Sequence, residues 1–333
     1  MKKILVLKGC AGLGNRIITV LSALVYAEKT NRDLYIDWSD GLYGETGKNM
    51  FTHYFTLKSS LYIDSMNYND IFAEGNTVYP DSIRKIACEP VYAHYFQTSH
   101  RFFKKFKGSR IAFLGFNKWK SHWSLEENRN KIHRFGAYMS SVFSSSSIPL
   151  GEFLSRNRKE DVVIFCDYLP TFLKEKLPLL RLSEPTATEF ITHKNKLNTV
   201  NRIGVHVRNT DMKPTRPVDE LIAGLKKRYG NPSIFLATDD AGIVEIFERE
   251  FSDVVELEKF RPQESIDKGL HKWASKNNAN NMAEQVFKES ILDLYLLASC
   301  NHIYYQGNSS FSRVAIHLFN KQSESCNWLT EKF

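Results

Sequence analysis

The sequence contains no apolar stretch near the ~20 residues that a membrane-spanning helix needs. Its first residues, MKKILVLKG, are apolar only at 4–7 before glycines follow, so the apolar core of a secretory signal is missing. The five cysteines are widely scattered, and no CxxC pair or Cys/His cluster has the spacing of metal ligands. We therefore expect a cytoplasmic protein with reduced thiols and with neither a metal ion nor another cofactor.

Length and charge narrow the possibilities further. A chain of 333 residues is too long for one ordinary α/β domain, so two domains of about 100–200 residues each are expected. The net charge of +8 implies an anionic partner, which is a nucleic acid, an anionic lipid or a phosphorylated ligand. Charge alone does not choose among the three.

The N-terminal segment predicts a βαβ unit. A strand is expected at 3–7, a glycine loop at 9–14, a helix at about 15–28 with apolar residues at helical spacing, and a second strand at 34–38. This opening favours a parallel sheet. Residues 40–160 have few clean periods, apart from a strand-like stretch at 111–116 and a serine-rich loop at 144–149.

The C-terminal part alternates regularly between strands and helices. Prolines mark a boundary near 170–185, and Thr186 with Glu189 resembles a capping box at the start of a helix. Strands are then predicted at 202–208, 233–237, 254–257 and 302–305, and helices from 218, at 243–251, at 283–298 and from 310. We expect an α/β protein with an N-terminal domain at 1–182, a doubly wound domain at 183–320 and a tail at 321–333.

Polar residues gather where the strands of the second domain end, which is where open α/β sheets bind ligands. The arginine of this set is a planar, permanently charged donor suited to phosphate oxygens. The serines offer hydroxyls and backbone N–H groups at a helix start, where anions are favoured. The candidates are His206, Arg208 and Asp211 after the first strand, Thr238, Asp239 and Asp240 after the second, and Ser309, Ser310, Ser312 and Arg313 after the fourth.

Asp293 is a further candidate because it lies within the apolar helical run ILDLYLL, where an unpaired charge is costly. We interpret it as an acceptor for a nucleotide base; the alternative is a structural partner for Arg313 or for a buried backbone N–H. The strand-end arginine and aspartates have a similar alternative as surface ion pairs. Their occurrence on successive strand ends of one sheet favours a site for a diphosphate-sugar.

The glycine loop of the first domain invites a dinucleotide-binding interpretation, which its spacing disfavours. The loop GCAGLGNR follows the pattern GxxGxG and lacks the third glycine of GxGxxG. We expect instead that it brings backbone and side chains close to a ligand between the domains. The residues concerned are Gly12, Gly14, Asn15 and Arg16.

Four segments resemble the NodZ-type bacterial fucosyltransferases and the related core fucosyltransferases. They are GLGNR with LYIDW, GVHVRNTD, which resembles an HVRxxD signature, FLATDD, and LDLYLLASCNHIYYQGNSSFSRVA. The resemblance covers about 1–40 and 183–320, while 41–182 has no convincing match. It implies a GT-B-like architecture of two Rossmann-like domains facing a central cleft, and inverting, metal-independent transfer of fucose from GDP-fucose. The implied acceptor is a glycan, such as a bacterial surface polysaccharide or lipopolysaccharide precursor.

The resemblance also implies residue roles. Arg208 would clamp the β-phosphate, and Asp293 would bind guanine. The remaining implied roles are pocket shape for His206 and Asp211, donor flanking for Thr238 with Asp239 or Asp240, diphosphate binding for Ser309, Ser310 and Ser312, and a contact from the first domain for Asn15. Core fucosyltransferases carry HVRRTDK and then a glutamate proposed as the base, whereas this chain has Asn209, Met212 and Arg216 near those places. Asp211 is therefore our candidate base.

Residues 100–123 hold many Lys and Arg, no acidic residue and interleaved aromatics. This composition fits a core strand flanked by solvated lysines, docking on an anionic membrane, or nucleic-acid binding. For a transferase we rank peripheral contact with the inner membrane above nucleic acid. Three other functions remain open for the whole chain: transfer of another GDP- or UDP-sugar, NAD-dependent oxidoreduction, and non-catalytic carbohydrate binding at a membrane.

Overall fold

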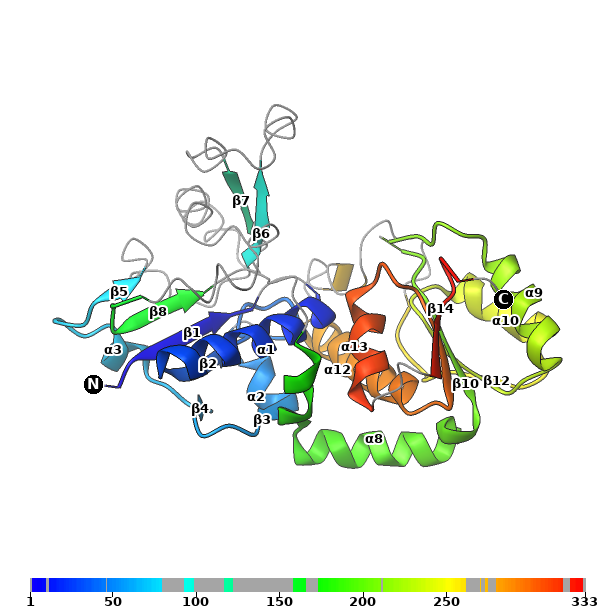
Figure 1. Cartoon of the computed structure of the whole chain (residues 1–333), viewed down its shortest axis with the longest axis horizontal. Helices are drawn as coiled ribbons and strands as arrows, with labels where there is room; N and C mark the ends of the chain where they lie inside the picture. The colour runs from blue at the N-terminus through cyan, green and yellow to red at the C-terminus, as the bar shows by residue number, and fades with distance from the viewer. Residues whose placement is uncertain are drawn as a thin grey trace. The chain divides into compact units, whose positions relative to one another are not determined.

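The chain divides into two compact units, Met1–Arg181 and Leu182–Phe333, which we describe separately (Figure 1). The computed structural model describes residues 2–9, 12–45, 47–79, 93–98, 117–121, 158–165, 173–210, 212–261, 270, 273–274, 280–319 and 324–331, with backbone alone at 93–98, 117–121 and 280–281. The predicted strand at 111–116 and loop at 144–149 lie outside these residues.

The first unit is built on a parallel sheet with the strand order β4-β2-β1-β8-β5. Its central strand is buried along its whole length, as is typical of parallel sheets covered on both faces. The strands are β1 (Ile4–Lys8), β2 (Asp33–Asp37), β4 (Tyr62–Ile63), β5 (Val78–Tyr79) and β8 (Val162–Phe165). The helices are α1 (Leu13–Thr30), α2 (Met50–Tyr54), α3 (Tyr68–Ile71) and the 3-10 turn η4 (Lys174–Leu179).

Two smaller strand pairs accompany this sheet. In one, β3 (Phe55–Leu57) lies beside β9 (Leu180–Leu182), and in the other, β6 (Ala93–Thr98) pairs antiparallel with β7 (Asn117–Ser121). The strand β7 is the part of residues 100–123 that the structure describes, and the rest of that basic segment lies outside the described residues.

The second unit is a parallel sheet with the strand order β12-β11-β10-β13-β14. The predicted α/β class is thus confirmed in both units. The strands are β10 (Ile203–Val207), β11 (Ile234–Thr238), β12 (Val254–Val255), β13 (His302–Tyr305) and β14 (Ser325–Asn327). The helices are α8 (Glu184–Leu197), α9 (Val218–Tyr229), α10 (Ala241–Glu250), α12 (Asn280–Ala298) and α13 (Ser310–Leu318), with a 3-10 turn η5 (Thr199–Asn201).

Helices cover both faces of this sheet, and the alternation of β10 assigns its residues to one face or the other. Val205 and Val207 pack with α9 and α10 in one hydrophobic cluster. Gly204 and His206 face the opposite side, toward α12 and α13. Figure 1 shows α9 and α10 on one side of the sheet and α12 and α13 on the other. His206 is therefore carried into the layer beneath α13 by the period of the strand.

Two details differ from the prediction. The capping box at Thr186 and Glu189 is wrong: α8 begins earlier, with Ser183 as its N-cap and Pro185 in its first turn, because a proline there loses no helical hydrogen bond. Thr186 lies inside the helix, where its hydroxyl is 2.9 Å from that of Ser183. The segment 321–333, expected to be a tail, contains β14, which is the edge strand of the second sheet.

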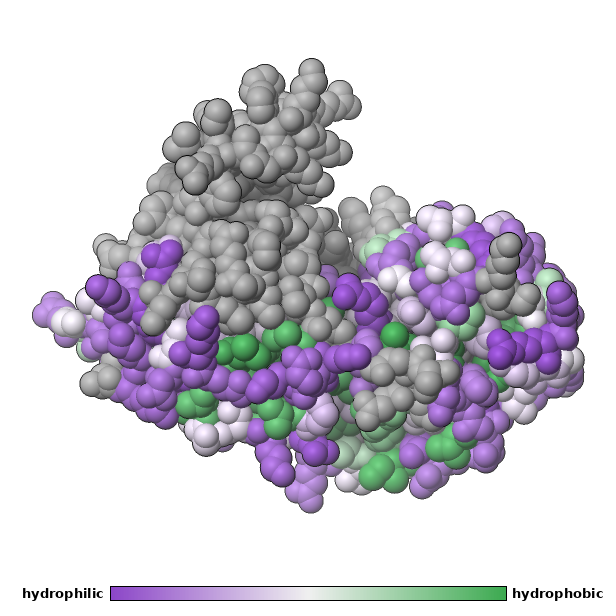
Figure 2. Space-filling view, in the orientation of Figure 1, coloured by the Kyte–Doolittle hydropathy of each residue, from purple (hydrophilic) through white to green (hydrophobic). Residues whose placement is uncertain are grey.

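The surface of the described residues carries few large hydrophobic side chains. Those that are exposed are Ile191, Val200 and Phe319. In Figure 2, hydrophilic side chains predominate on the visible face of the second unit, with smaller hydrophobic patches among them. None of the described helices combines the length and the apolar character needed to cross a membrane.

The close packing of β10 against α12 predicts that a larger residue at Gly204 destabilises the fold. A Cβ atom at Gly204 would lie 2.9 Å from Leu297 Cδ1 and 3.0 Å from Cys300 Cβ. Overpacking of this kind costs typically ~1–3 kcal/mol. We expect Gly204→Ala to lower the free energy of unfolding by that amount in urea denaturation followed by circular dichroism. Ile191→Ala, at a side chain 53% exposed, is the control and should change it little. Equal midpoints for both variants would contradict the close packing.

Candidate functional site

The strand order of the second unit places a topological switch point between β10 and β13. The strands β11 and β12 extend from one side of β10, and β14 extends from the far side of β13. The connections therefore leave these two neighbours in opposite directions, and the carboxyl ends of such a pair are where open α/β sheets bind their ligands. Arg208 directly follows β10, and Gln306 directly follows β13. The site is built from these two chain segments upward.

Gln306 joins the two strand ends. Its side chain is fully buried. Its Oε1 accepts the backbone N–H of Arg208 at 2.8 Å, and its Nε2 donates to the carbonyl of Met212 at 2.8 Å. Both ends of the loop after β10 are thereby fixed to β13. We did not single out Gln306 from the sequence; the available signal was a polar residue at the end of a predicted buried strand.

The two aspartates after β11 brace the same loop. Asp239 accepts the backbone N–H of Asn209 at 2.8 Å and the hydroxyl of Thr210 at 2.5 Å, and its Oδ2 lies 3.9 Å from Arg208 Nε. Asp240 caps α10 by accepting the N–H of Gly242 at 2.7 Å, and it accepts the Asn209 side-chain amide at 2.7 Å. Both carboxylates thus orient the loop that carries Arg208. Thr238, which ends β11, is buried.

His206 is buried beneath α13 in a defined tautomer. The hydroxyl of Ser312 donates to the carbonyl of Gln306 at 2.9 Å and lies 2.9 Å from His206 Nδ1. Because a hydroxyl has one proton, Nδ1 carries the hydrogen in this arrangement and Nε2 is an acceptor. Burial, with Arg208 and Lys259 nearby, lowers the pKa of His206 to about 3. The ring is therefore neutral at physiological pH, and it stacks on Phe311.

The start of α13 offers groups suited to an anion. Ser309 is its N-cap residue, and the buried Ser309 Oγ has no hydrogen-bond partner among the described residues. Ser310 is half-buried, Ser312 is buried and Arg313 is exposed. No acidic residue occupies the first turn, so the helix N-terminus keeps its favourable potential for negative charge.

Asp293 points from α12 into a buried ion pair with Lys259. The partner is thus neither Arg313 nor a backbone N–H, the two structural alternatives of the sequence analysis. Burial raises the pKa of Asp293, and Lys259 opposes that rise. The second carboxylate oxygen, Oδ1, is buried and has no hydrogen-bond partner among the described residues. A buried acceptor without a partner is costly, so this oxygen is a candidate for binding a ligand N–H.

The segment after β12 supplies two cations that the sequence analysis did not identify. The charge of Lys259 acts to lower the pKa of both Asp293 and His206. Arg261 pairs with Glu256 and donates to the carbonyl of Thr238 at 3.3 Å. The signal was present, because KFR follows the third predicted strand of a sheet whose other strand ends had been identified as candidates.

The glycine loop of the first unit packs around an inward-pointing arginine. Arg16 is 1% exposed, and its Nη2 lies 2.5 Å from Asp40 Oδ2. The guanidinium also lies over the rings of Trp38 and Tyr43. A Cβ at Gly9 would lie 2.2 Å from Arg16 Nη1, so this arginine requires that glycine.

The other residues predicted in this loop occupy the start of α1. Gly12 is the N-cap of α1, Gly14 is buried, and Asn15 is half-buried in the first turn. Asp37, which would complete a dinucleotide fingerprint, is buried and bonded to Lys8, Ser39 and Tyr68. Burial raises the pKa of Asp37, but these partners outweigh it and hold the pKa below its usual value. Its oxygens are occupied within the unit.

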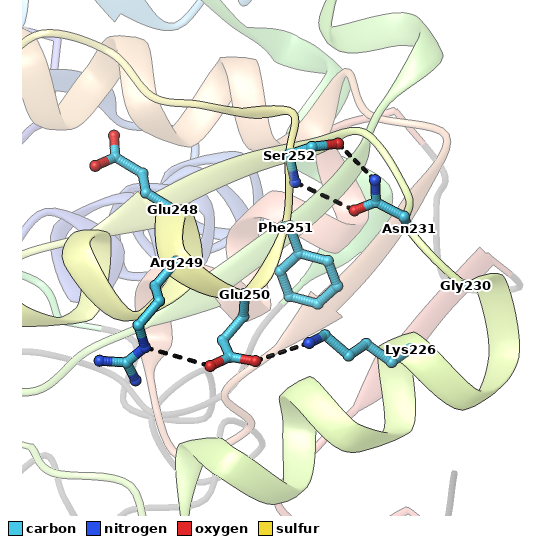
Figure 3. Close-up of a pocket in the computed structure, with 8 residues that line it drawn as sticks. All are labelled: Lys226, Gly230, Asn231, Glu248, Arg249, Glu250, Phe251 and Ser252. Carbon is cyan, nitrogen blue, oxygen red and sulfur yellow. Dashed lines mark hydrogen bonds and ion pairs between the residues drawn. The ribbon is translucent and has the colours of Figure 1, made fainter.

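Three further features define the limits of the site. Asp211, our candidate base, lies outside the described residues. Within the described part of the chain, no group of three or more His, Cys, Asp or Glu side chains is arranged to hold a metal ion. A surface pocket at the C-terminal ends of α9 and α10 is lined by residues already paired with one another, such as Lys226 with Glu250 and Asn231 with Ser252 (Figure 3).

Comparisons with known proteins yield likeness in structure alone. No protein-family description and no curated protein sequence matches the chain. Among solved structures, NodZ α-1,6-fucosyltransferase soaked with GDP-fucose is similar with a TM-score of 0.59 and 16% identity, over 96% of this chain and 93% of that one. The Bradyrhizobium fucosyltransferase NodZ follows with a TM-score of 0.56 and 16% identity, over 95% and 92%. The chain therefore has the GT-B-like α/β fold of NodZ, which its sequence predicted.

Proposed function

We propose that the chain is a glycosyltransferase that moves fucose from GDP-fucose to a glycan acceptor with inversion at the sugar carbon. The observation that carries this proposal is the convergence of Arg208, His206 and the start of α13 at one switch point. The support from outside the site is its fold, shared with a NodZ that was soaked with GDP-fucose.

The diphosphate is assigned to Arg208 and the N-terminal turn of α13. Glycosyl transfer passes through an oxocarbenium-like state, while negative charge grows on the departing diphosphate. A preorganised guanidinium and backbone N–H groups stabilise that charge without reorganising during the reaction. Two contacts hold the arginine segment in place before the reaction: the backbone N–H of Arg208 donates a hydrogen bond to Gln306, and the carboxylate of Asp239 lies beside the guanidinium. The hydroxyl of Ser309, which has no partner among the described residues, is a further donor for the same oxygens.

We assign binding of the nucleotide's base to Asp293 and His206, because both side chains present hydrogen-bond acceptors. Guanine carries adjacent N–H donors at N1 and at its 2-amino group, and these complement a carboxylate. Uracil has one N–H between two carbonyl oxygens, and each of those oxygens would face an acceptor. Asp293 Oδ1 is buried without a partner among the described residues. A hydrogen bond from the ligand to this oxygen would remove the cost of leaving it unsatisfied. This chemistry favours a GDP-sugar over a UDP-sugar.

Asp211 is our candidate for the base that removes the acceptor's proton as its oxygen attacks the sugar. Arg216, near the place of the glutamate in core fucosyltransferases, has another task in this chain. It pairs with Glu220 at 2.6 Å and donates to the carbonyls of Trp328 and Glu331. An arginine is always protonated and does not serve as a base. The role therefore falls to a carboxylate in the adjoining loop.

Replacing Arg208 tests the diphosphate assignment. We expect Arg208→Ala to lower turnover of GDP-fucose by at least ~100-fold, because one preorganised donor to a developing anion is worth about that much. The circular dichroism spectrum should stay unchanged. Arg249→Ala is the matched control, since it removes a cation of the same unit whose side chain is 70% exposed. Turnover of both variants near that of the parent would remove Arg208 from the mechanism.

A thermal-shift panel tests the donor. Ligands that bind only the folded protein raise its melting temperature. A ligand at a concentration of 100 times its Kd adds about 2.7 kcal/mol to the free energy of unfolding. We expect GDP, GDP-fucose and GDP-mannose to stabilise the protein, with UDP and NAD weaker or inactive. Turnover of GDP-fucose then separates fucose from other GDP-sugars. Stabilisation by NAD alone would favour an oxidoreductase and contradict the proposal.

We also propose, from the sequence of 100–123, that the enzyme contacts the inner membrane peripherally and uses a surface polysaccharide or lipopolysaccharide precursor as acceptor. Flotation with liposomes tests the membrane contact. We expect the protein to float with liposomes rich in anionic phospholipid at low salt and to dissociate as salt screens the lysines. Absence from both anionic and neutral liposomes at every salt concentration would end the membrane proposal without affecting the donor site.

A further inference from the structure

The ion pair between Lys259 and Asp293 is almost completely buried. The side chains are 5% and 10% exposed, respectively. Charges this far from water are costly, so a buried pair contributes little to stability by itself and is often replaceable by apolar residues. The pair in this chain is also incomplete, because Asp293 Oδ1 keeps no partner among the described residues. Both features are expected of a prepared acceptor.

The backbone on either side of Lys259 is anchored. The N–H of Phe260 donates to Glu289 Oε2 at 3.0 Å, which ties the segment to α12, the helix that carries Asp293. Arg261 is held by Glu256 at 2.9 Å and by the carbonyl of Thr238. Lys259 therefore contacts Asp293 from a backbone segment that is held in place by its neighbours, and not from a loose surface loop.

Among the residues that the structure describes, the charges around Asp293 come from two elements. The segment after β12 contributes the cations Lys259 and Arg261 and the anion Glu256, and α12 contributes Glu289. Glu289 is engaged by Gln285 and by the backbone of Phe260. His206, the nearest titratable group on β10 that Lys259 influences, is neutral. Lys259 is thus the cation in direct contact with the carboxylate.

We propose that Lys259 is a positioning residue for the base: it holds the Asp293 carboxylate ionised and oriented, with Oδ1 open to the N–H donors of guanine. This inference rests on the proposed function and adds a residue that sets base selectivity and the pH range of nucleotide binding. An ionised carboxylate is an acceptor at both oxygens, whereas a protonated one presents an O–H that would oppose a guanine N–H. Recognition of the base therefore depends on a cation that does not touch it.

The sign of the pH effect follows from burial. Without Lys259, burial is opposed less, so the pKa of Asp293 rises further and the carboxyl takes up its proton at a higher pH. Guanine binding should then weaken as pH falls, beginning at a higher pH than in the parent protein. If Lys259 instead bound the diphosphate, its replacement would weaken the binding of GDP and of IDP equally, with no such dependence on pH.

The experiment is calorimetric titration of the full chain with GDP and with IDP, which lacks the 2-amino group, between pH 5.5 and 8.5. For the parent we expect GDP to bind about 10-fold more tightly than IDP, since one donor to a buried charged acceptor is lost. For Lys259→Met we expect GDP binding at least ~10-fold weaker near pH 6, a GDP/IDP ratio approaching one there, and a pH midpoint at least about one unit higher.

Matched variants separate positioning from folding. Lys226→Met removes a lysine paired with a carboxylate on α10, in the pocket of Figure 3, and should behave as the parent. Lys259→Arg keeps the charge and should restore the parent pH profile. The double variant Lys259→Met/Asp293→Asn removes both charges, so it avoids an unpaired buried anion and should fold, with weak binding of GDP at every pH.

The outcomes distinguish the two proposals. A parent protein that binds no GDP at any pH overturns the proposed function, and this inference with it. A parent that binds GDP, with Lys259→Met showing the same GDP/IDP ratio and pH profile, overturns the inference alone. Where Lys259→Met does not fold, the double variant decides, because GDP affinity equal to that of the parent would show that the pair is not used for the base.

Discussion

The hydrogen bonds of Gln306 across the β10–β13 switch point hold together the part of the molecule that carries the candidate site. The connections of these two parallel strands leave in opposite directions, and nothing in the ladder itself fixes the loops beyond the strand ends. Gln306 joins the two ends through hydrogen bonds to the backbone of Arg208 and Met212. Its own carbonyl accepts from Ser312, which orients His206. One buried amide therefore sets the positions of a guanidinium, a neutral imidazole and the start of a helix.

Around this bridge, the carboxylates of the second unit divide into two kinds. Asp239 and Asp240 are committed to the loop after β10, so their contribution is to position the segment that carries Arg208. Asp293 is held from one side by Lys259, and its Oδ1 has no partner among the residues described. The difference between these carboxylates lies in their partners rather than in the residue type, and it is the reason why we propose Asp293 as the acceptor for the nucleotide's base. In the first unit, the carboxylates of Asp40 and Asp37 are likewise committed, to Arg16 and to Lys8.

For the second unit, the sequence by itself determined the order of elements and the edge of the sheet at which the candidate site lies. Strands β10, β11 and β13 are short apolar runs that end in polar residues, and their helices follow at regular intervals. A strand buried on both faces must be apolar, and the polar groups that follow it must reach the ligand edge, so both are written locally in the chain. The start of α13 at Ser310 is as predicted, and β13 has the predicted bounds.

Only the tertiary structure decided which polar groups satisfy one another. Gln306 is 98 residues from Arg208, and Lys259 is 34 residues from Asp293, so neither contact leaves a periodic or spaced signal in the sequence. The same holds for Arg16, whose inward direction depends on Asp40 and two aromatic rings. Strand and helix periods report burial along one element, whereas the partner of a buried charge depends on which distant segments the fold brings against it.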